Sequence, residues 1–223
     1  MMKNENQIRN LVKKLRSGEF NDRDRKTDAN DRASYLIDHD PPDGWNYLES
    51  DTTWSEKWII SMSLGPWEEK QTQDVMGKVL DALNKRPLTK LHKNERLPFP
   101  KLQGDWQWEW TIYLSEYLRE IDWSDSEFFT MLKNIDGGGL AARAALRAIC
   151  EAWGTSKTID YFIREALDLE IIPIDRHVKR MLVNFGLSNL KQEELIALCK
   201  AIGVKPQRLA RALYKAYSPP NLG

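Results

Sequence analysis

One lysine and one aspartate have the residue types and the spacing to perform covalent chemistry on an electrophilic carbon. Lys157 follows Gly154-Thr155-Ser156 and precedes an apolar run, so we expect it in the first turn of a helix. That end of a helix carries partial positive charge, which favours the neutral, nucleophilic form of an amine. Asp175 follows eighteen residues later, shortly after Pro173. The pair could supply a nucleophile and a carboxylate that stabilises positive charge or moves a proton.

A purely structural interpretation of both residues stays open at this point. Lys157 could be an ordinary surface lysine. Asp175 could simply cap a helix over Arg176–Phe185, since Pro173 forbids helix continuation and aspartate is a common N-cap residue.

Two helices separated by a tight break are expected to position Lys157. The first run, about Leu140 to Trp153, is rich in Ala, Leu and Arg, and Gly154 is expected to cap its end. Thr155 or Ser156 can cap the second helix. Its buried face is predicted by apolar residues at i, i+3, i+4 and i+7: Ile159, Phe162, Ile163 and Ala166. The sequence thus predicts a helix-hairpin-helix over about residues 140–169, whose exposed N–H groups could bind phosphate.

This stretch resembles the helix-hairpin-helix and Gly/Pro-Asp signature of the HhH-GPD superfamily of DNA glycosylases. Lys157-Thr158 matches the catalytic lysine of that signature, and Ile174-Asp175-Arg176-His177-Val178 matches its aspartate segment. Ala166-Leu167-Asp168, followed by Ile172-Pro173-Ile174-Asp175, is most similar to the 8-oxoguanine DNA glycosylase/AP lyase branch. The family hairpin usually reads Leu-Pro-Gly-Val-Gly, whereas this chain has Glu151-Ala152-Trp153-Gly154-Thr155, with a single glycine.

The resemblance implies a role for each matching position. Lys157 and Asp175 would be catalytic. The hairpin residues Gly154, Thr155 and Ser156 would contact DNA, and His177 would contact a phosphate near the lesion. Lys70-Gln71-Thr72-Gln73-Asp74-Val75 is similar to a family segment in which a glutamine fills the gap left by the extruded base, so Gln71 is a further DNA-binding candidate; an exposed helix start is the alternative for it.

The function implied is base-excision repair of double-stranded DNA that contains a damaged base. A lysine-bearing member would remove an oxidised purine such as 8-oxoguanine through a Schiff base and would then nick the strand. Two alternatives stay open. One is a monofunctional glycosylase for alkylated or mismatched bases, with Lys157 merely structural. The other is a helix-hairpin-helix module that binds DNA without any enzymatic activity.

The expected fold is all-α, with two helical lobes and a DNA-binding cleft between them. The lobes are expected to comprise residues 1–53 plus 178–223, and residues 54–177. Apolar spacing predicts further helices in several places, which are Ile8 to Leu15, a run from Trp54, a run ending near Leu83, a run from about Trp106, a run from Asp122–Asp125 to about Ile135, and the pair Leu190–Ile202 and Pro206–Tyr217 joined at Gly203. The polar run Asn21 to Arg32 is expected to be a loop or a solvated helix.

Bulk composition is that of an ordinary globular protein. The 223 residues are 41% hydrophobic, and 33 basic residues balance 33 acidic ones. Cys150 and Cys199 fall in helical patterns and are expected to be reduced core thiols; two are too few for an iron–sulfur cluster. We expect no metal or other cofactor, no membrane span, a monomer, and a cytoplasmic, nucleoid-associated location.

Two segments concentrate positive charge despite the neutral total. Lys85 to Lys101 contains six Lys/Arg residues and one acidic residue, Glu95. The last helix carries a basic stripe formed by Lys205, Arg208, Arg211 and Lys215. For each segment, a solvated surface and a phosphate-contacting surface are both compatible with the sequence.

Overall fold

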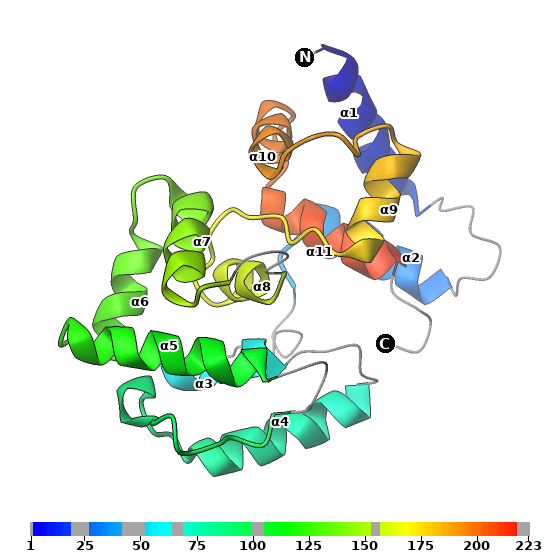
Figure 1. Ribbon diagram of the computed structural model, residues 1–223. Coiled ribbons are helices and arrows are strands. Elements are labelled where there is room, and N and C mark those ends of the chain that lie inside the picture. The colour runs from blue at the N-terminus through cyan, green and yellow to red at the C-terminus, as the bar shows by residue number, and fades with distance from the viewer. Residues whose placement is uncertain are drawn as a thin grey trace. The chain divides into compact units, whose positions relative to one another are not determined.

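The computed structural model describes residues 2–18, 27–41, 52–63, 69–99, 105–152 and 157–217. Every regular element among these residues is a helix, as Figure 1 shows, so the all-α prediction is confirmed for them. The chain divides into two compact units, one formed by residues 1–45 and 170–223 and the other by residues 46–169. We refer to them as the terminal unit and the central unit.

The described residues of the terminal unit form five helices from both ends of the chain, which are α1 (Met2–Ser17), α2 (Thr27–Asp38), α9 (Arg176–Asn184), α10 (Gln192–Ala201) and α11 (Pro206–Tyr217). Helix α11 packs against α2, α9 and α10, and α1 packs against α2, α10 and α11. The apolar spacing at the chain's start explains the position of α1, because Ile8, Leu11 and Leu15 are fully buried. The unit therefore brings the first and last helices of the sequence into one core.

Helix α2 lies partly where the sequence had suggested a loop or solvated helix. It begins at Thr27, inside the polar run, and it is not merely solvated. One side of α2 is buried, since Ala33, Leu36 and Ile37 are all at most 2% exposed. Tertiary burial of those three side chains outweighs the polar composition of the first turns.

The central unit holds the remaining helices, which are α3 (Trp54–Ser63), α4 (Glu69–Leu83), the 3₁₀ turn η1 (Leu88–Lys90), α5 (Trp106–Glu120), α6 (Asp125–Lys133), α7 (Gly138–Ile149) and α8 (Lys157–Glu165). Helix α3 packs against α4, α5, α6 and α8. An aromatic cluster forms the core of the central unit. The Trp58 ring lies edge-on to the Phe162 ring, with 5.2 Å between the centroids, and the centroid of the Phe129 ring lies 5.0 Å from that of Phe162. The indole Nε1 of Trp58 donates to Thr111 Oγ1 at 3.1 Å, so the buried polar edge of this side chain is satisfied.

Two helix starts in this unit are fixed by reciprocal caps. The hydroxyl of Thr53 accepts from Glu56 N at 3.2 Å, and Glu56 Oε2 accepts from Thr53 N at 2.7 Å. Ser124 and Glu127 form the same capping box before α6. Both boxes satisfy backbone N–H groups that no helical carbonyl can reach, which is why α3 and α6 begin where they do.

The boundary of the central unit differs from the predicted range 54–177. Residues 170–177 are assigned to the terminal unit. A buried contact explains this assignment, because Gln192 Nε2 of α10 donates to the carbonyl oxygen of Ile172 at 2.6 Å. Asp175 therefore belongs to the terminal unit, and Lys157 belongs to the central one.

Both cysteines are free and buried, as the sequence indicated. Burial raises the pKa of each thiol, that of Cys199 to about 12. A thiol so protonated is a weak nucleophile, which fits a packing role.

Residues of the basic stripe predicted on the last helix form ion pairs within the terminal unit. Arg208 donates to both carboxylate oxygens of Asp40, at 3.2 and 2.8 Å, and to the carbonyl oxygen of Asp38 at 2.6 Å. Lys205 and Arg211 each lie 3.8 Å from the same carboxylate. Three of the four cations thus surround one aspartate.

Candidate functional site

The helical pair α7–α8 carries the candidate nucleophile. Gly137 lies in the left-handed region at φ +91° and leads into α7, and the two helices pack against each other. Helix α7 ends at Ile149, four residues before the predicted end at Trp153, and the predicted cap at Gly154 is wrong. Glu151 holds the left-handed position instead, at φ +51°.

A Schellman motif explains this earlier end. Ala152 N donates to Arg147 O at 2.9 Å, and Glu151 N donates to Ala148 O at 3.4 Å. The Arg147 side chain adds a hydrogen bond from Nε to Ala152 O at 2.9 Å. A residue with a Cβ pays a conformational cost of roughly 1 kcal/mol in this backbone region, where glycine would not. These bonds hold the first part of the connection in a defined shape; Gly154, Thr155 and Ser156 lie outside the described residues.

Lys157 is the first residue of α8, and its side chain is exposed. The three residues that follow it are all buried, so α8 enters the core immediately after the lysine. Of the predicted apolar face, Ile159, Phe162 and Ile163 are fully buried and Ala166 is partly buried. The helix thus presents Lys157 to solvent from a well-packed start.

Buried charges on α8 lie next to this lysine; the sequence places Asp160 in the first turn of this helix but did not predict its burial or its partner. Asp160, in the first turn of α8, is 2% exposed, and its Oδ1 lies 2.8 Å from Nε of Arg143 on α7. The N–H direction does not satisfy hydrogen-bond geometry at this distance, so the contact is an ion pair rather than an aligned hydrogen bond. An acidic residue in a first turn is also favoured by the helix dipole. The i, i+3 relation to Lys157 was the available sequence signal.

A second buried pair lies at the other end of α8. Nε of Arg164 is 2.5 Å from Oε1 of Glu165, and both side chains are under 10% exposed. The guanidinium also lies 5.3 Å from the centroid of the Tyr161 ring. Each buried charge on this helix therefore faces an opposite one, as burial in a low-dielectric interior requires.

Asp175 immediately precedes α9 and caps it. Its Oδ1 accepts from Val178 N at 2.8 Å, the geometry of an N-cap bonded to the third helical residue. Pro173 follows the buried Ile171 and Ile172, so the chain is anchored in the core shortly before α9 begins. The structural role suggested for Asp175 is therefore present, and it does not exclude a chemical one.

The remaining site candidates lie outside the described side chains. Gln71 is within α4 and His177 within α9, but only their helical backbone is described. Their proposed DNA contacts stay predictions.

Among the described residues, no group of three or more His, Cys, Asp or Glu side chains could hold a metal ion. In the same part of the chain, no helix is both long and apolar enough to cross a membrane.

Comparisons with protein-family models, curated proteins and solved structures found no match to this chain.

Proposed function

We propose that the protein is a base-excision DNA glycosylase with AP lyase activity, and that it acts on oxidised purines such as 8-oxoguanine. One observation carries the proposal: Lys157 is an exposed amine at the first residue of the second helix of a packed helical pair, and Asp175 begins another helix eighteen residues later. This is the spacing of the HhH-GPD signature that the sequence resembles. We assign the helix-hairpin-helix to α7, α8 and the residues between them.

The chemistry proposed for Lys157 is nucleophilic. The damaged nucleotide is rotated out of the stack, and the neutral amine attacks C1′ of its sugar. The N-glycosidic bond breaks, and the base leaves with the bonding electrons and takes up a proton. Ring opening gives a Schiff base between Nζ and C1′. Loss of a C2′ proton then expels the 3′ phosphate by β-elimination, which nicks the strand.

Asp175 has a separate role in this proposal. Its carboxylate stabilises the positive charge that develops on the sugar, or assists proton transfer. One carboxylate oxygen already accepts from Val178 N, which fixes the side-chain orientation. The hydrogen bond that caps α9 therefore also orients the Asp175 carboxylate for its chemical role.

The test is borohydride trapping on a duplex that contains 8-oxoguanine, because borohydride reduces the Schiff base to a stable amine. We expect a covalent protein–DNA adduct with the wild type and none with Lys157→Gln. Lys133→Gln, which changes an exposed lysine on α6, is the matched control and should trap like the wild type. Efficient trapping by Lys157→Gln would refute the nucleophile assignment.

A conservative variant isolates the carboxylate. Asp175→Asn keeps an oxygen that can accept from Val178 N, and asparagine caps helices as well as aspartate does. We expect an unchanged melting temperature and a loss of about 10²–10⁴ in the excision rate. A panel of lesions in the same assay separates the alternatives: a monofunctional glycosylase would leave an abasic site cleaved only by alkali, and a binding module would release no base.

A further inference from the structure

Residues 84–99, the described part of the connection between α4 and α5, form a series of turns rather than an open loop. Three hydrogen-bonded turns follow one another: Arg86 N donates to Leu83 O at 3.1 Å, Lys90 N to Pro87 O at 3.0 Å, and Glu95 N to His92 O at 2.9 Å. Each turn contains one lysine, and these are Lys85, Lys90 and Lys93. All three side chains are exposed.

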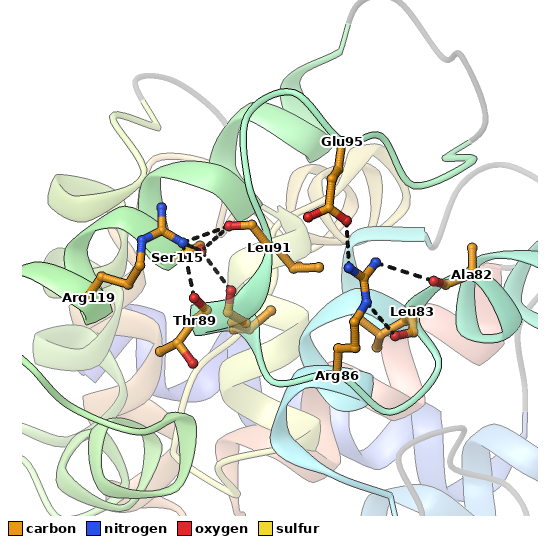
Figure 2. A network of polar contacts seen from close by, with 9 residues as sticks. Ala82, Leu83, Arg86, Thr89, Leu91, Glu95, Ser115 and Arg119 are labelled. Carbon is orange, nitrogen blue, oxygen red and sulfur yellow. Dashed lines mark hydrogen bonds and ion pairs between the residues drawn. The ribbon is translucent and has the colours of Figure 1, made fainter.

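Polar side chains of α5 and α6, the buried Ser115 and Asp125 and the exposed Arg119, hold this segment in place. The hydroxyl of Ser115 lies 2.7 Å from Leu88 O and 2.9 Å from Leu91 O, and Arg119 Nη1 donates to Leu91 O at 2.7 Å and to Thr89 O at 3.1 Å. Figure 2 shows Ser115 and Arg119 reaching the carbonyl groups of the segment from α5. From α6, Asp125 Oδ2 accepts from Leu88 N at 2.8 Å.

Apolar anchors complete the attachment. Leu88, Leu91 and Leu97 are at most 3% exposed, so the segment is pinned along its length. A backbone fixed in this way loses little further conformational entropy when it binds a partner, which is an advantage that an unanchored basic loop lacks.

The acidic groups of the segment are already neutralised. Glu95 accepts from Arg86 Nη1 at 2.5 Å, and that hydrogen bond lowers the pKa of the Glu95 carboxyl (Figure 2). Asp105, which immediately precedes α5, pairs with Arg96. The charge left exposed by the three turns is therefore positive, although the chain as a whole has no net charge.

We propose that Lys85, Lys90 and Lys93 form a surface that binds the phosphate backbone of duplex DNA. Lysines act as point charges that suit phosphates without reading base identity. The backbone N–H groups of Arg86, Lys90 and Glu95 already donate within the turns, and that of Leu88 donates to Asp125, which favours phosphate contact through the lysine ammonium groups. The choice of DNA as the polyanion rests on the proposed function, but the surface does not require base excision.

The experiment measures how binding of an undamaged duplex depends on salt. Each lysine that neutralises a phosphate contributes about one to the negative slope of log K against log salt concentration. We expect K85Q/K90Q/K93Q to lower the magnitude of the slope by about 2–3 relative to the wild type. K3Q/K78Q/K133Q, which removes three exposed lysines from three other helices, should leave the slope unchanged within about 0.5.

Lys85 has a left-handed φ of +56°, so a substitution there could disturb the fold, and a second variant leaves this residue unchanged. K90E/K93E leaves that position intact and should weaken binding more than K90Q/K93Q does, because repulsion is added to the lost attraction. The proposal would be overturned if K85Q/K90Q/K93Q kept the wild-type slope, or if the control K3Q/K78Q/K133Q lost as much of the slope as K85Q/K90Q/K93Q did. It would also be overturned if the wild type did not bind the duplex. If the triple variant reduces the slope but the wild type is not trapped by borohydride, this surface is retained and the Schiff-base glycosylase/lyase is refuted. If the wild type is trapped but the variant leaves the slope unaltered, the lyase is retained and this surface is refuted.

Discussion

At the scale of single residues, the ion pair between Asp160 and Arg143 is the contact most directly coupled to the candidate nucleophile. It joins α7 to the first turn of α8, one turn from Lys157. A buried carboxylate stabilises the fold only while its cation remains opposite. The stability of the packing of α7 against α8, next to Lys157, should therefore depend on this pair.

Asp160→Asn tests that dependence. Removing the charge leaves the Arg143 guanidinium, 24% exposed, opposite a neutral amide, and water can screen only part of the loss. We expect a destabilisation of about 2 kcal/mol in urea unfolding. Glu5→Gln, which removes the charge from the exposed pair with Arg9, is the control and should cost less than about 1 kcal/mol. Equal effects of the two substitutions would mean that burial contributes nothing to the α7–α8 pair.

The candidate site was only partly predictable at this scale. The N-cap role of Asp175 follows from its local sequence, since the bond to Val178 spans three residues. Glu151 was missed because local reasoning assigns a helix end to the nearest glycine, and a Schellman motif with a glutamate in the left-handed position overrides that preference.

At the scale of elements, two glycines, one inside a helix and one just after a helix, should respond oppositely to the same substitution. Gly77 is an exposed residue in the interior of α4, and an added Cβ would meet nothing within 4 Å. Gly203 follows α10 at φ +72°, in a Schellman motif closed by Val204 N donating to Cys199 O at 2.9 Å. Helix propensity governs the first site, and left-handed backbone strain governs the second.

We therefore expect Gly77→Ala to stabilise the protein by about 0.5–1 kcal/mol and Gly203→Ala to destabilise it by about 1 kcal/mol. Both effects should appear as shifts of the urea midpoint at constant m-value. Shifts of the same sign in the two variants would contradict this assignment of the two backbone conformations.

Element positions were predictable wherever apolar spacing is strong. The helices expected from Trp106 and over Pro206–Tyr217 begin at those residues. Helix α2 was not predictable in the same way, because the three side chains that bury it occupy a short part of a polar segment and gain their stability from α11 and α1. Apolar spacing shows which side of a helix is apolar, whereas the burial of that side depends on the other helices that pack against it.

At the scale of the whole molecule, sequence reasoning could not identify the partner of the α11 stripe. Arg208 and Asp40 are separated by 168 positions, and no local pattern relates them. The stripe had two interpretations from the sequence, and the fold assigns three of its cations to one carboxylate. That carboxylate links the residues after α2 to the last helix.

This link should make stability depend on acidic pH in a defined direction. The hydrogen bond from Arg208 lowers the pKa of the Asp40 carboxyl below its ordinary value of 3.8, and the charges of Arg208, Lys205 and Arg211 act in the same sense against the opposing effect of burial. A depressed folded-state pKa adds stability that is present above the unfolded value and is lost as the pH falls through the folded one. Asp40→Asn should therefore lower the urea midpoint at pH 6, and its difference from the wild type should shrink progressively as the pH falls below the ordinary carboxyl value of 3.8 and through the lower folded-state pKa. Asp136→Asn, an exposed aspartate of the central unit, should not alter the profile. A constant difference between Asp40→Asn and the wild type from pH 6 to pH 2.5 would show that the carboxylate charge does not hold the two ends of the chain together.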